Sequence, residues 1–267
     1  MIDLHVHSKR CHHAVGEPAE YVAAARAAGI TTMAFTDHLP LPAEYDGDWD
    51  YAMPACELSD YVDDVREVQR IAEAQGGPEI LLGIEADWMC GREETLAEEL
   101  PAYPWDIVLG SVHFQGSWAF DDPALTDEYQ RREIHQVWRR YFEDVAASAC
   151  TGLFDVIGHA DLVKKFGYYP EGDLVGYYRT AIDAMAATGV AFECNASGLR
   201  KPVAEIYPSL EFMRMARLAG VRATMGSDAH APSEVGSGLA DAREALLAVG
   251  YRSVLVFRDR VAEEVAL

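Results

Sequence analysis

Imidazole and carboxylate side chains close a series of short apolar segments, and these residues are the best candidates for chemistry. His5 and His7 flank Val6 at the end of the first segment, and His13 follows in the next loop. Residues two apart in an extended chain point the same way, so both rings of the first pair can face one metal ion. Later segments end in the same residue types: Thr36-Asp37-His38, Gly83-Ile84-Glu85-Ala86-Asp87, Gly110-Ser111-Val112-His113, Gly158-His159-Ala160-Asp161 and Ser227-Asp228-Ala229-His230. A single His-x-His is usually structural, but the same ending on six segments indicates one shared site.

Imidazoles with a few carboxylates and no paired thiols suit zinc, iron or manganese rather than calcium or an iron–sulfur cluster. This many ligands exceed the needs of one ion, so we expect two or three divalent ions with a carboxylate bridging between them. Such a cluster activates water as hydroxide and stabilises both the attacking and the leaving oxygen of phosphoryl transfer. Three divalent ions with Glu85, Asp228 and one hydroxide leave a local charge of roughly +3, which can bind a phosphate in an acidic chain. Hydrolysis of a phosphate ester is therefore the leading hypothesis.

Three cations follow the segment ends and are candidates for binding the substrate. Arg200 stands between Gly198 and Pro202 in a shaped loop, and its guanidinium can offer two parallel hydrogen bonds to a phosphate. Lys165 and Lys164 are the other candidates, and a role in surface solubility is the alternative for both.

The longest irregular stretch, Leu39 to Cys56, is a candidate lid. Its acidic and aromatic side chains suit a substrate that carries an ammonium group and an imidazole, although acidic runs are more often a solvated surface. These side chains are Glu44, Tyr45, Asp46, Asp48, Trp49, Asp50 and Tyr51. Trp88, Phe114 and Trp118 follow predicted ligands, and each could form an apolar wall or simply pack in the core.

Strands and helices must alternate to bring the segment ends together. Apolar strands are predicted at 1–6, 31–36, 79–86, 107–112, 154–158, 190–194, 222–226 and 253–257. Helices are predicted at 18–29, 57–74, from 93, 127–149, 174–187, 209–219 and 240–248. Seven or eight strands alternating with helices predict an α/β barrel, with a doubly wound sheet as the less favoured alternative. Barrel enzymes build their active sites at the C-terminal ends of the strands, where the predicted ligands fall.

The composition excludes several classes of protein. The 267 residues include 22 Lys and Arg against 44 Asp and Glu, a net charge of −22, so neither nucleic acid nor an anionic membrane is an expected partner. No apolar segment is long enough to span a membrane, and no signal peptide is recognisable. Five scattered cysteines without a Cys-x-x-Cys pair indicate reduced thiols and a cytoplasmic location. We expect a single domain over residues 1–267, and the oligomeric state is not predicted.

The motifs together resemble a known family over nearly the whole chain. HVH at 5, TDH at 36, GIEAD at 83, GSVH at 110, GHAD at 158 and GSDAH at 226 resemble the polymerase and histidinol phosphatase (PHP) superfamily. That resemblance implies a distorted (β/α)7 barrel with a trinuclear metal centre. CHHAVGEP, TDHLPLP, LVKKFG and NASGLRKPVAEIYP are similar to the histidinol-phosphate phosphatase branch, which hydrolyses L-histidinol phosphate to L-histidinol and phosphate in histidine biosynthesis.

The resemblance also implies which residues hold each ion. The first ion would be held by His5, His7, Glu85 and Asp228, and Glu85 would bridge to a second ion held by His113 and His159. The third would be held by His13, His38 and His230. His12 is the alternative to His13, which is favoured because the family places this ligand directly before Ala-x-Gly, here Ala14-Val15-Gly16. Glu85, Asp228 and His230 are the expected catalytic residues, whereas His135 and Cys11 are expected to pack or face solvent.

Three other functions remain open from the sequence. A related PHP phosphoesterase would act on nucleotides or other small phosphate esters. An amidohydrolase-type enzyme is less favoured, because those barrels commonly bridge two ions through a carboxylated lysine, and Lys164 and Lys165 do not stand at a strand end. A metal-storage protein is the non-enzymatic alternative.

Overall fold

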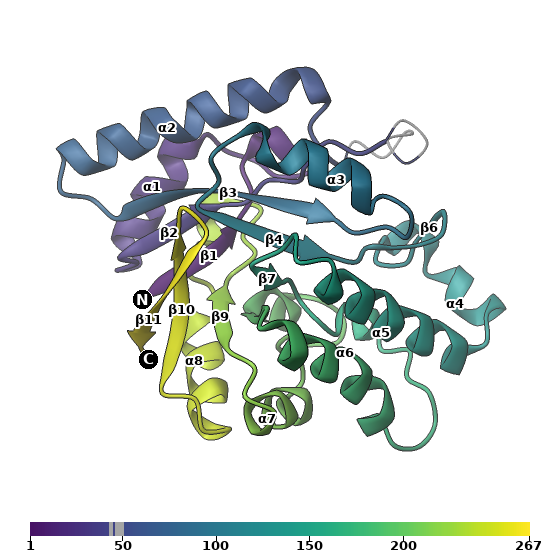
Figure 1. Ribbon diagram of the computed structural model, residues 1–267. Helices are drawn as coiled ribbons and strands as arrows, with labels where there is room; N and C mark the ends of the chain where they lie inside the picture. The colour runs from purple at the N-terminus through teal and green to yellow at the C-terminus, as the bar shows by residue number, and fades with distance from the viewer. Residues whose placement is uncertain (43–44, 46–50) are drawn as a thin grey trace.

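Seven parallel strands form one sheet that curves into a nearly closed barrel (Figure 1). The computed structural model describes residues 1–42, 45 and 51–267. The strands lie in chain order: β1 (Ile2–Val6), β2 (Thr32–Phe35), β3 (Glu79–Asp87), β4 (Ile107–Ser111), β7 (Val156–Ile157), β8 (Ala191–Asn195) and β9 (Ala223–Gly226). Past the ends of β1 and β9 the two edges meet, because the amide of His7 donates to the carbonyl of Ala229 at 2.9 Å and that of Asp228 donates to the carbonyl of His5 at 2.8 Å. The predicted distorted (β/α)7 barrel is confirmed.

The helices lie around the outside of this barrel, as expected when every strand is followed by a crossover (Figure 1). They are α1 (Pro18–Ala27), α2 (Leu58–Ala74), α3 (Glu93–Glu99), α4 (Asp127–Arg131), α5 (Ile134–Cys150), α6 (Val175–Thr188), α7 (Leu210–Leu218) and α8 (Leu239–Ala248). α6 illustrates their ends: it stops at Gly189, whose φ of 81° is the left-handed conformation that glycine adopts without strain.

One predicted helix is in fact two. The sequence indicated a single helix over 127–149, but Arg132 has an extended backbone with φ −113° and ψ 155°, which ends α4. Glu133 then starts α5, because its carboxylate accepts hydrogen bonds from the amides of His135 and Gln136. The inward face of α5, which includes Trp138 and Tyr141, is buried against the barrel.

The strand predicted near the C-terminus does not belong to the barrel sheet. β10 (Ser253–Arg258) pairs antiparallel with β11 (Val261–Ala266), which the sequence did not predict. The turn residue Arg260 donates its amide to the carbonyl of Asp106 and pairs its guanidinium with Asp155 at 3.0 Å. Because Asp106 and Asp155 stand just before β4 and β7, this hairpin covers the N-terminal end of those strands. A second short hairpin, β5 (Phe114–Gln115) with β6 (Trp118–Ala119), was also not predicted.

Alternation along β1 shows how polar side chains enter the barrel interior. All five residues of the strand are buried, with Ile2, Leu4 and Val6 belonging to the apolar core. Asp3 and His5 point to the other side, where Asp3 accepts hydrogen bonds from the amide and the hydroxyl of Ser227. The barrel axis is therefore lined by polar groups at its C-terminal end.

Part of the predicted lid can be described. Tyr45 contacts Phe114, with ring centroids 5.3 Å apart, and Tyr51 lies against His38 at 4.2 Å. The acidic residues Glu44, Asp46, Asp48 and Asp50, together with Trp49, lie outside the described residues. In the part of the chain that is described, no helix combines the length and the apolar character needed to cross a membrane.

Candidate metal centre

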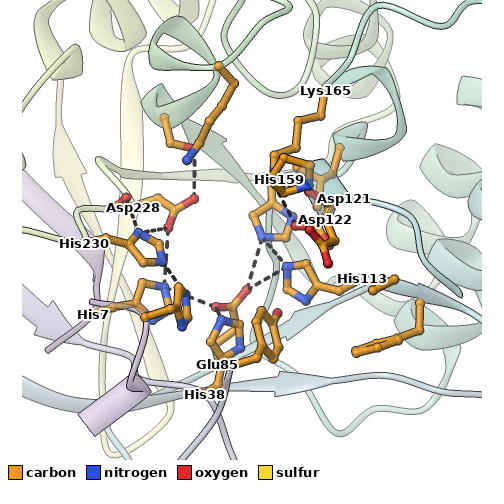
Figure 2. A pocket seen from close by; sticks show the side chains of 18 residues that line it. His7, His38, Glu85, His113, Asp121, Asp122, His159, Lys165, Asp228 and His230 are labelled. Carbon is orange, nitrogen blue, oxygen red and sulfur yellow. Dashed lines mark hydrogen bonds and ion pairs between the residues drawn. The ribbon is translucent and has the colours of Figure 1, made fainter. Parts of the chain in front are cut away.

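The predicted ligands converge on one cavity of about 390 Å³ at the C-terminal ends of the barrel strands (Figure 2). β1 carries His5, and His7 is the first residue after that strand ends. β3 carries Glu85. The other ligands lie in the loops that directly follow the strands. The residues of this set that line the cavity are His7, His13, His38, Glu85, His113, His159, Asp228 and His230.

Glu85 lies at the centre of the cluster, with its two carboxylate oxygens facing different imidazoles. Its Oε2 lies 3.1 Å from His5 Nε2 and 3.3 Å from His7 Nε2. Its Oε1 lies 3.1 Å from His159 Nε2 and 3.8 Å from His113 Nε2. Figure 2 shows the same arrangement, with Glu85 between the His7 and His38 side and the His113 and His159 side. This is the geometry expected of a bridging carboxylate.

Asp228 completes the group around the His5 and His7 rings. Asp228 Oδ1 lies 3.4 Å from His7 Nε2 and 3.8 Å from His5 Nε2, and the two Nε2 atoms are 2.9 Å apart. Asp228 Oδ2 faces away and accepts hydrogen bonds from Ser197 Oγ at 2.9 Å and Asn195 Nδ2 at 3.2 Å. Only Oδ1 is therefore directed at the imidazoles.

A third group of imidazoles stands beside the first. His13 Nε2 and His230 Nε2 are 2.8 Å apart, and the rings of His13 and His38 have centroids 5.5 Å apart. His12 is not part of this group: its Nε2 lies 3.5 Å from a carboxylate oxygen of Glu57, away from the cavity. The structure thus places His13 in the cluster rather than its neighbour.

Hydrogen bonds behind the rings indicate that these side chains suit a metal ion. His5 Nδ1 lies 2.8 Å from a carboxylate oxygen of Glu193, and His13 Nδ1 lies 2.8 Å from the carbonyl of Cys11. Because both partners only accept, each Nδ1 carries the proton and each Nε2 presents a lone pair to the cluster. The same holds for His230, whose Nδ1 lies 3.1 Å from the carbonyl of Asp228. The Nε2 lone pairs of His13 and His230 therefore face each other at 2.8 Å and repel unless a cation lies between them. The donor set therefore fits divalent metal ions, with the orientation that outer hydrogen bonds give to metal-binding histidines.

The electrostatics of the cluster differ between its imidazoles. Burial opposes protonation of His5 and His113, but Glu193 and Glu85 raise the pKa of His5 well above its ordinary value, and Asp87 raises the pKa of His113 to about 9. Burial, assisted by the neighbouring His38, lowers the pKa of His13 to about 4. Burial and His13 outweigh Asp228 and lower the pKa of His230 to about 3. Burial raises the pKa of Glu85, but the His38 and His5 imidazoles prevail and hold it well below its ordinary value.

Two carboxylates that support the ligands were not predicted as site residues. Asp87 follows Glu85 by two positions and so shares its face of β3, where Asp87 Oδ1 lies 2.7 Å from His113 Nδ1. Glu193 on β8 bonds His5 and also accepts from the amide of His159 at 3.0 Å. The sequence signal was present, because Glu193 interrupts an otherwise apolar predicted strand.

The three predicted substrate cations have different surroundings. Lys165 lines the cavity, where its Nζ donates to Asp121 Oδ2 at 3.0 Å, and this lysine lowers the pKa of Asp121 to about 2 against the effect of burial. Lys164 is fully buried outside the cavity and pairs with Asp161 at 3.0 Å, so its ammonium is not available to a substrate there. This is a correction to the prediction for Lys164.

Arg200 is also placed differently from the prediction. Its Nη2 donates to the carbonyls of Ser227 and Asp228 at 2.8 and 3.0 Å, and it does not line the cavity. The guanidinium therefore holds the loop that carries Asp228. The next residue, Lys201, lines the cavity instead and was not predicted.

The structure also shows where the remaining predicted residues lie. Phe114 and Tyr51 line the cavity, whereas Trp88 and Trp118 are buried elsewhere, and Trp118 packs on Tyr129. His135 is on α5, outside the cavity, and its Nδ1 lies 2.8 Å from the hydroxyl of Tyr177 on α6. Cys11 is buried, with Sγ 3.2 Å from His7 Nδ1.

Comparison with known proteins agrees with the family resemblance of the sequence motifs. A family model for the PHP domain matches residues 3–197. The chain is 42% identical to a "Probable histidinol-phosphatase" of Deinococcus radiodurans, over 97% of both chains, and 28% identical to the "Histidinol-phosphatase" of Bacillus subtilis, over 88% of this chain and 95% of the relative. In fold it is similar to the crystal structure of a histidinol phosphate phosphatase from Lactococcus lactis complexed with zinc, L-histidinol and phosphate. That match has a TM-score of 0.82 at 20% identity and covers 98% of each chain.

Proposed function

Because this chain belongs to the PHP domain family, we propose that it is a metal-dependent histidinol-phosphatase, which hydrolyses L-histidinol phosphate to L-histidinol and phosphate. The observation that carries this function is the placement of Glu85, whose two oxygens face separate imidazole groups at the C-terminal end of the barrel. This arrangement suits the joint activation of water and phosphate. The 42% identity to a histidinol-phosphatase relative along both chains supports the choice of substrate.

The ligands divide into three positions in this proposal. His5, His7, Glu85 and Asp228 would hold the first ion, Glu85 with His113 and His159 would hold the second, and His13, His38 and His230 would hold the third. Two or three divalent transition ions, zinc, iron or manganese, supply when bound an ionised water nucleophile near neutral pH and neutralise phosphate charge. Several of these imidazoles are oriented before any ion binds, because the Nδ1 atoms of His5, His13 and His113 are already hydrogen-bonded to other groups of the protein.

Side chains around the cluster position the substrate and the proton. Lys165 and Lys201 line the cavity and bind the phosphate oxygens as charge-assisted donors. Asp228 Oδ1 faces the first metal position, where it would hold that ion and accept a hydrogen bond from the attacking water, because Oδ2 is occupied by Ser197 and Asn195. His230 beside it stays neutral and orients the same group.

The organic part of the substrate is proposed to lie at the outer part of the cavity. Asp121 and Asp122 contribute carboxylates there, and Tyr51 and Phe114 contribute aromatic surface. A substrate with an ammonium group and an imidazole complements both.

Five free cysteines fit a reducing compartment, and on that basis we propose a cytoplasmic location for the enzyme.

Phosphate release from a substrate panel tests this function. The metal-loaded enzyme is assayed with L-histidinol phosphate, nucleoside monophosphates and a dihydropyrimidine, and Glu85→Gln serves as the inactive control. We expect kcat/KM for L-histidinol phosphate to exceed that for any nucleotide by at least about 100-fold, since several polar contacts are lost in the mismatched substrate. A preference for nucleotides would assign a different phosphoesterase, and turnover of the dihydropyrimidine would assign an amidohydrolase.

The origin of the transferred oxygen tests the mechanism. In a single turnover in ¹⁸O-labelled water, one labelled oxygen should appear in the released phosphate, because water attacks phosphorus directly. A trapped phosphoenzyme would require a covalent mechanism instead.

A further inference from the structure

We propose that Asp87 is a positioning residue that orients the imidazoles of His113 and His38 together, and so links the second and third metal positions. The inference rests on the metal centre of the proposed function. It concerns a residue that lies behind the ligands and does not line the cavity.

The position of Asp87 follows from the geometry of β3. It is the last residue of that strand, two positions after Glu85, so both carboxylates point into the barrel. The residue is only 1% exposed. Asp87 also pairs in register with Ser111 of β4, two residues before His113, which keeps the carboxylate close to that ring.

Each oxygen of Asp87 faces a different ring. Oδ1 lies 2.7 Å from His113 Nδ1 in a short hydrogen bond, whereas Oδ2 lies 3.4 Å from His38 Nδ1, which is an ion-pair contact and not a hydrogen bond. Within the described residues neither Oδ2 nor His38 Nδ1 has a hydrogen-bond partner elsewhere, so each is left to face the other. An ionised carboxylate only accepts hydrogen bonds, so it holds the proton of His113 on Nδ1. Its negative charge beside His38 Nδ1 favours the same tautomer in that ring. Their Nε2 lone pairs then point toward the ligand cluster, where His38 Nε2 is 3.4 Å from Glu85 Oε2 and His113 Nε2 is 3.3 Å from His159 Nε2.

Glu193 shows that this role is separate from that of other buried carboxylates. It is also 1% exposed, but it orients His5 and the backbone of His159. Among the described residues, no hydrogen bond or ion pair of Glu193 reaches His38 or His113. Glu193 therefore provides a matched control of equal burial that acts on the first metal position through His5 and does not contact a ligand of the third.

An asparagine at position 87 makes the prediction specific to one atom. Asparagine keeps the size of aspartate but offers one acceptor oxygen and one donor nitrogen. If its oxygen keeps the short bond to His113, its amide nitrogen faces His38 Nδ1 and favours the tautomer with the proton on Nε2. That tautomer has no lone pair for the third ion, so Asp87→Asn should weaken that ion selectively.

Metal content and chelator competition test the proposal without relying on activity. We expect Asp87→Asn protein to lose about one ion per chain, or to bind its weakest ion about 10- to 100-fold less tightly in competition with a chelator. Added to a His38→Ala background, Asp87→Asn should cause no further loss at the third position, whereas Glu193→Gln should still weaken a further ion. Should Asp87→Asn not yield folded protein, Asp87→Ser is measured in the same way and should loosen both rings.

Three results would overturn the proposal. The first is Asp87→Asn protein with the metal content and chelator resistance of the wild type. The second is full additivity with His38→Ala. The third is an equal fall in melting temperature for metal-free and metal-loaded Asp87→Asn protein, which would indicate a purely structural role. If the wild type binds the ions but does not hydrolyse L-histidinol phosphate, the proposed function fails while this test remains valid.

Discussion

At the scale of single residues, Glu85 has the largest expected effect because it faces both imidazole groups. Glu85→Gln keeps the volume but removes the charge shared by two metal positions. We expect metal content to fall by at least one ion per chain and kcat/KM to fall by about 100-fold or more. Elemental analysis and phosphate release measure both quantities. Glu205→Gln, at a half-exposed carboxylate paired with Lys164, is the control and should stay within about twofold of the wild type.

Lys201 and Arg200 are neighbours with different expected roles. Lys201→Ala removes a cation of the cavity wall, and losing a charge-assisted contact of about 1.5 to 3 kcal/mol lowers kcat/KM about 10- to 100-fold with metal content unchanged. Arg200→Lys instead loosens the carbonyls of Ser227 and Asp228, so the enzyme should lose metal more readily in chelator. Kinetics at saturating metal separate the two effects. A large rise in KM for Arg200→Lys with normal metal retention would mean that Arg200 grips the phosphate, as its sequence context suggested.

At the scale of elements, the β10–β11 hairpin should contribute to stability and not to catalysis. Arg260→Ala removes the guanidinium contacts with Asp155 and with the carbonyl of Leu153. Alanine and arginine strain the left-handed backbone at φ 63° to a similar degree, so the substitution reports the contacts alone. Because Arg260 is partly exposed, we expect the free energy of unfolding to fall by only about 1 kcal/mol. Denaturant unfolding measures this, and a change in kcat/KM beyond twofold would contradict the assigned location.

Asp144 on helix α5 makes the free energy of unfolding depend on pH. Burial raises the pKa of Asp144 to about 6, although Arg140 opposes the shift. The folded protein thus holds this proton more tightly than the unfolded chain does, so the stabilisation is complete below the unfolded pKa of about 4 and is lost as pH rises through about 6. Asp144→Asn removes this loss. Between about pH 4 and pH 7 its stability relative to the wild type should therefore rise, by about 1 to 2 kcal/mol after allowance for solvent screening. A difference independent of pH would show that Asp144 titrates normally.

Particular residues show what the sequence could and could not predict at this scale. The strand ends that carry His5, Glu85 and Asp228 follow from apolar segments and from the geometry of parallel barrels. The break between α4 and α5 does not, because it depends on one extended residue, Arg132, inside an otherwise helical pattern. The partner of Arg200 could not be predicted either, because the carbonyl of Ser227 is brought to it only by the tertiary fold. Asp161 stands only three residues before Lys164, but the complete burial of this ion pair depends on the tertiary fold.

At the scale of the whole molecule, bound ions should stabilise the fold as well as catalyse. An ion that binds only the folded state at about 1,000 times its Kd adds about 4 kcal/mol, and a domain of this size gains about 2–4 °C in Tm per kcal/mol. Removing the ions with a chelator should therefore lower Tm by roughly 10 °C or more and abolish phosphate release. Differential scanning calorimetry before and after dialysis measures the shift. Readdition of zinc should restore both properties, and an unchanged Tm would contradict a buried metal cluster.

Asp228 has a consequence for attempts to redesign the metal preference of this barrel. Its φ of 52° lies in the left-handed region, which glycine, asparagine and aspartate tolerate better than other residues. Of these three, only aspartate supplies a charged ligand. Two independent requirements thus leave very few residue types acceptable at this position, whereas His5 and Glu85 lie in strands and have no left-handed backbone, so many side chains fit there. Libraries that aim at another metal should vary those strand positions and keep Asp228 constant.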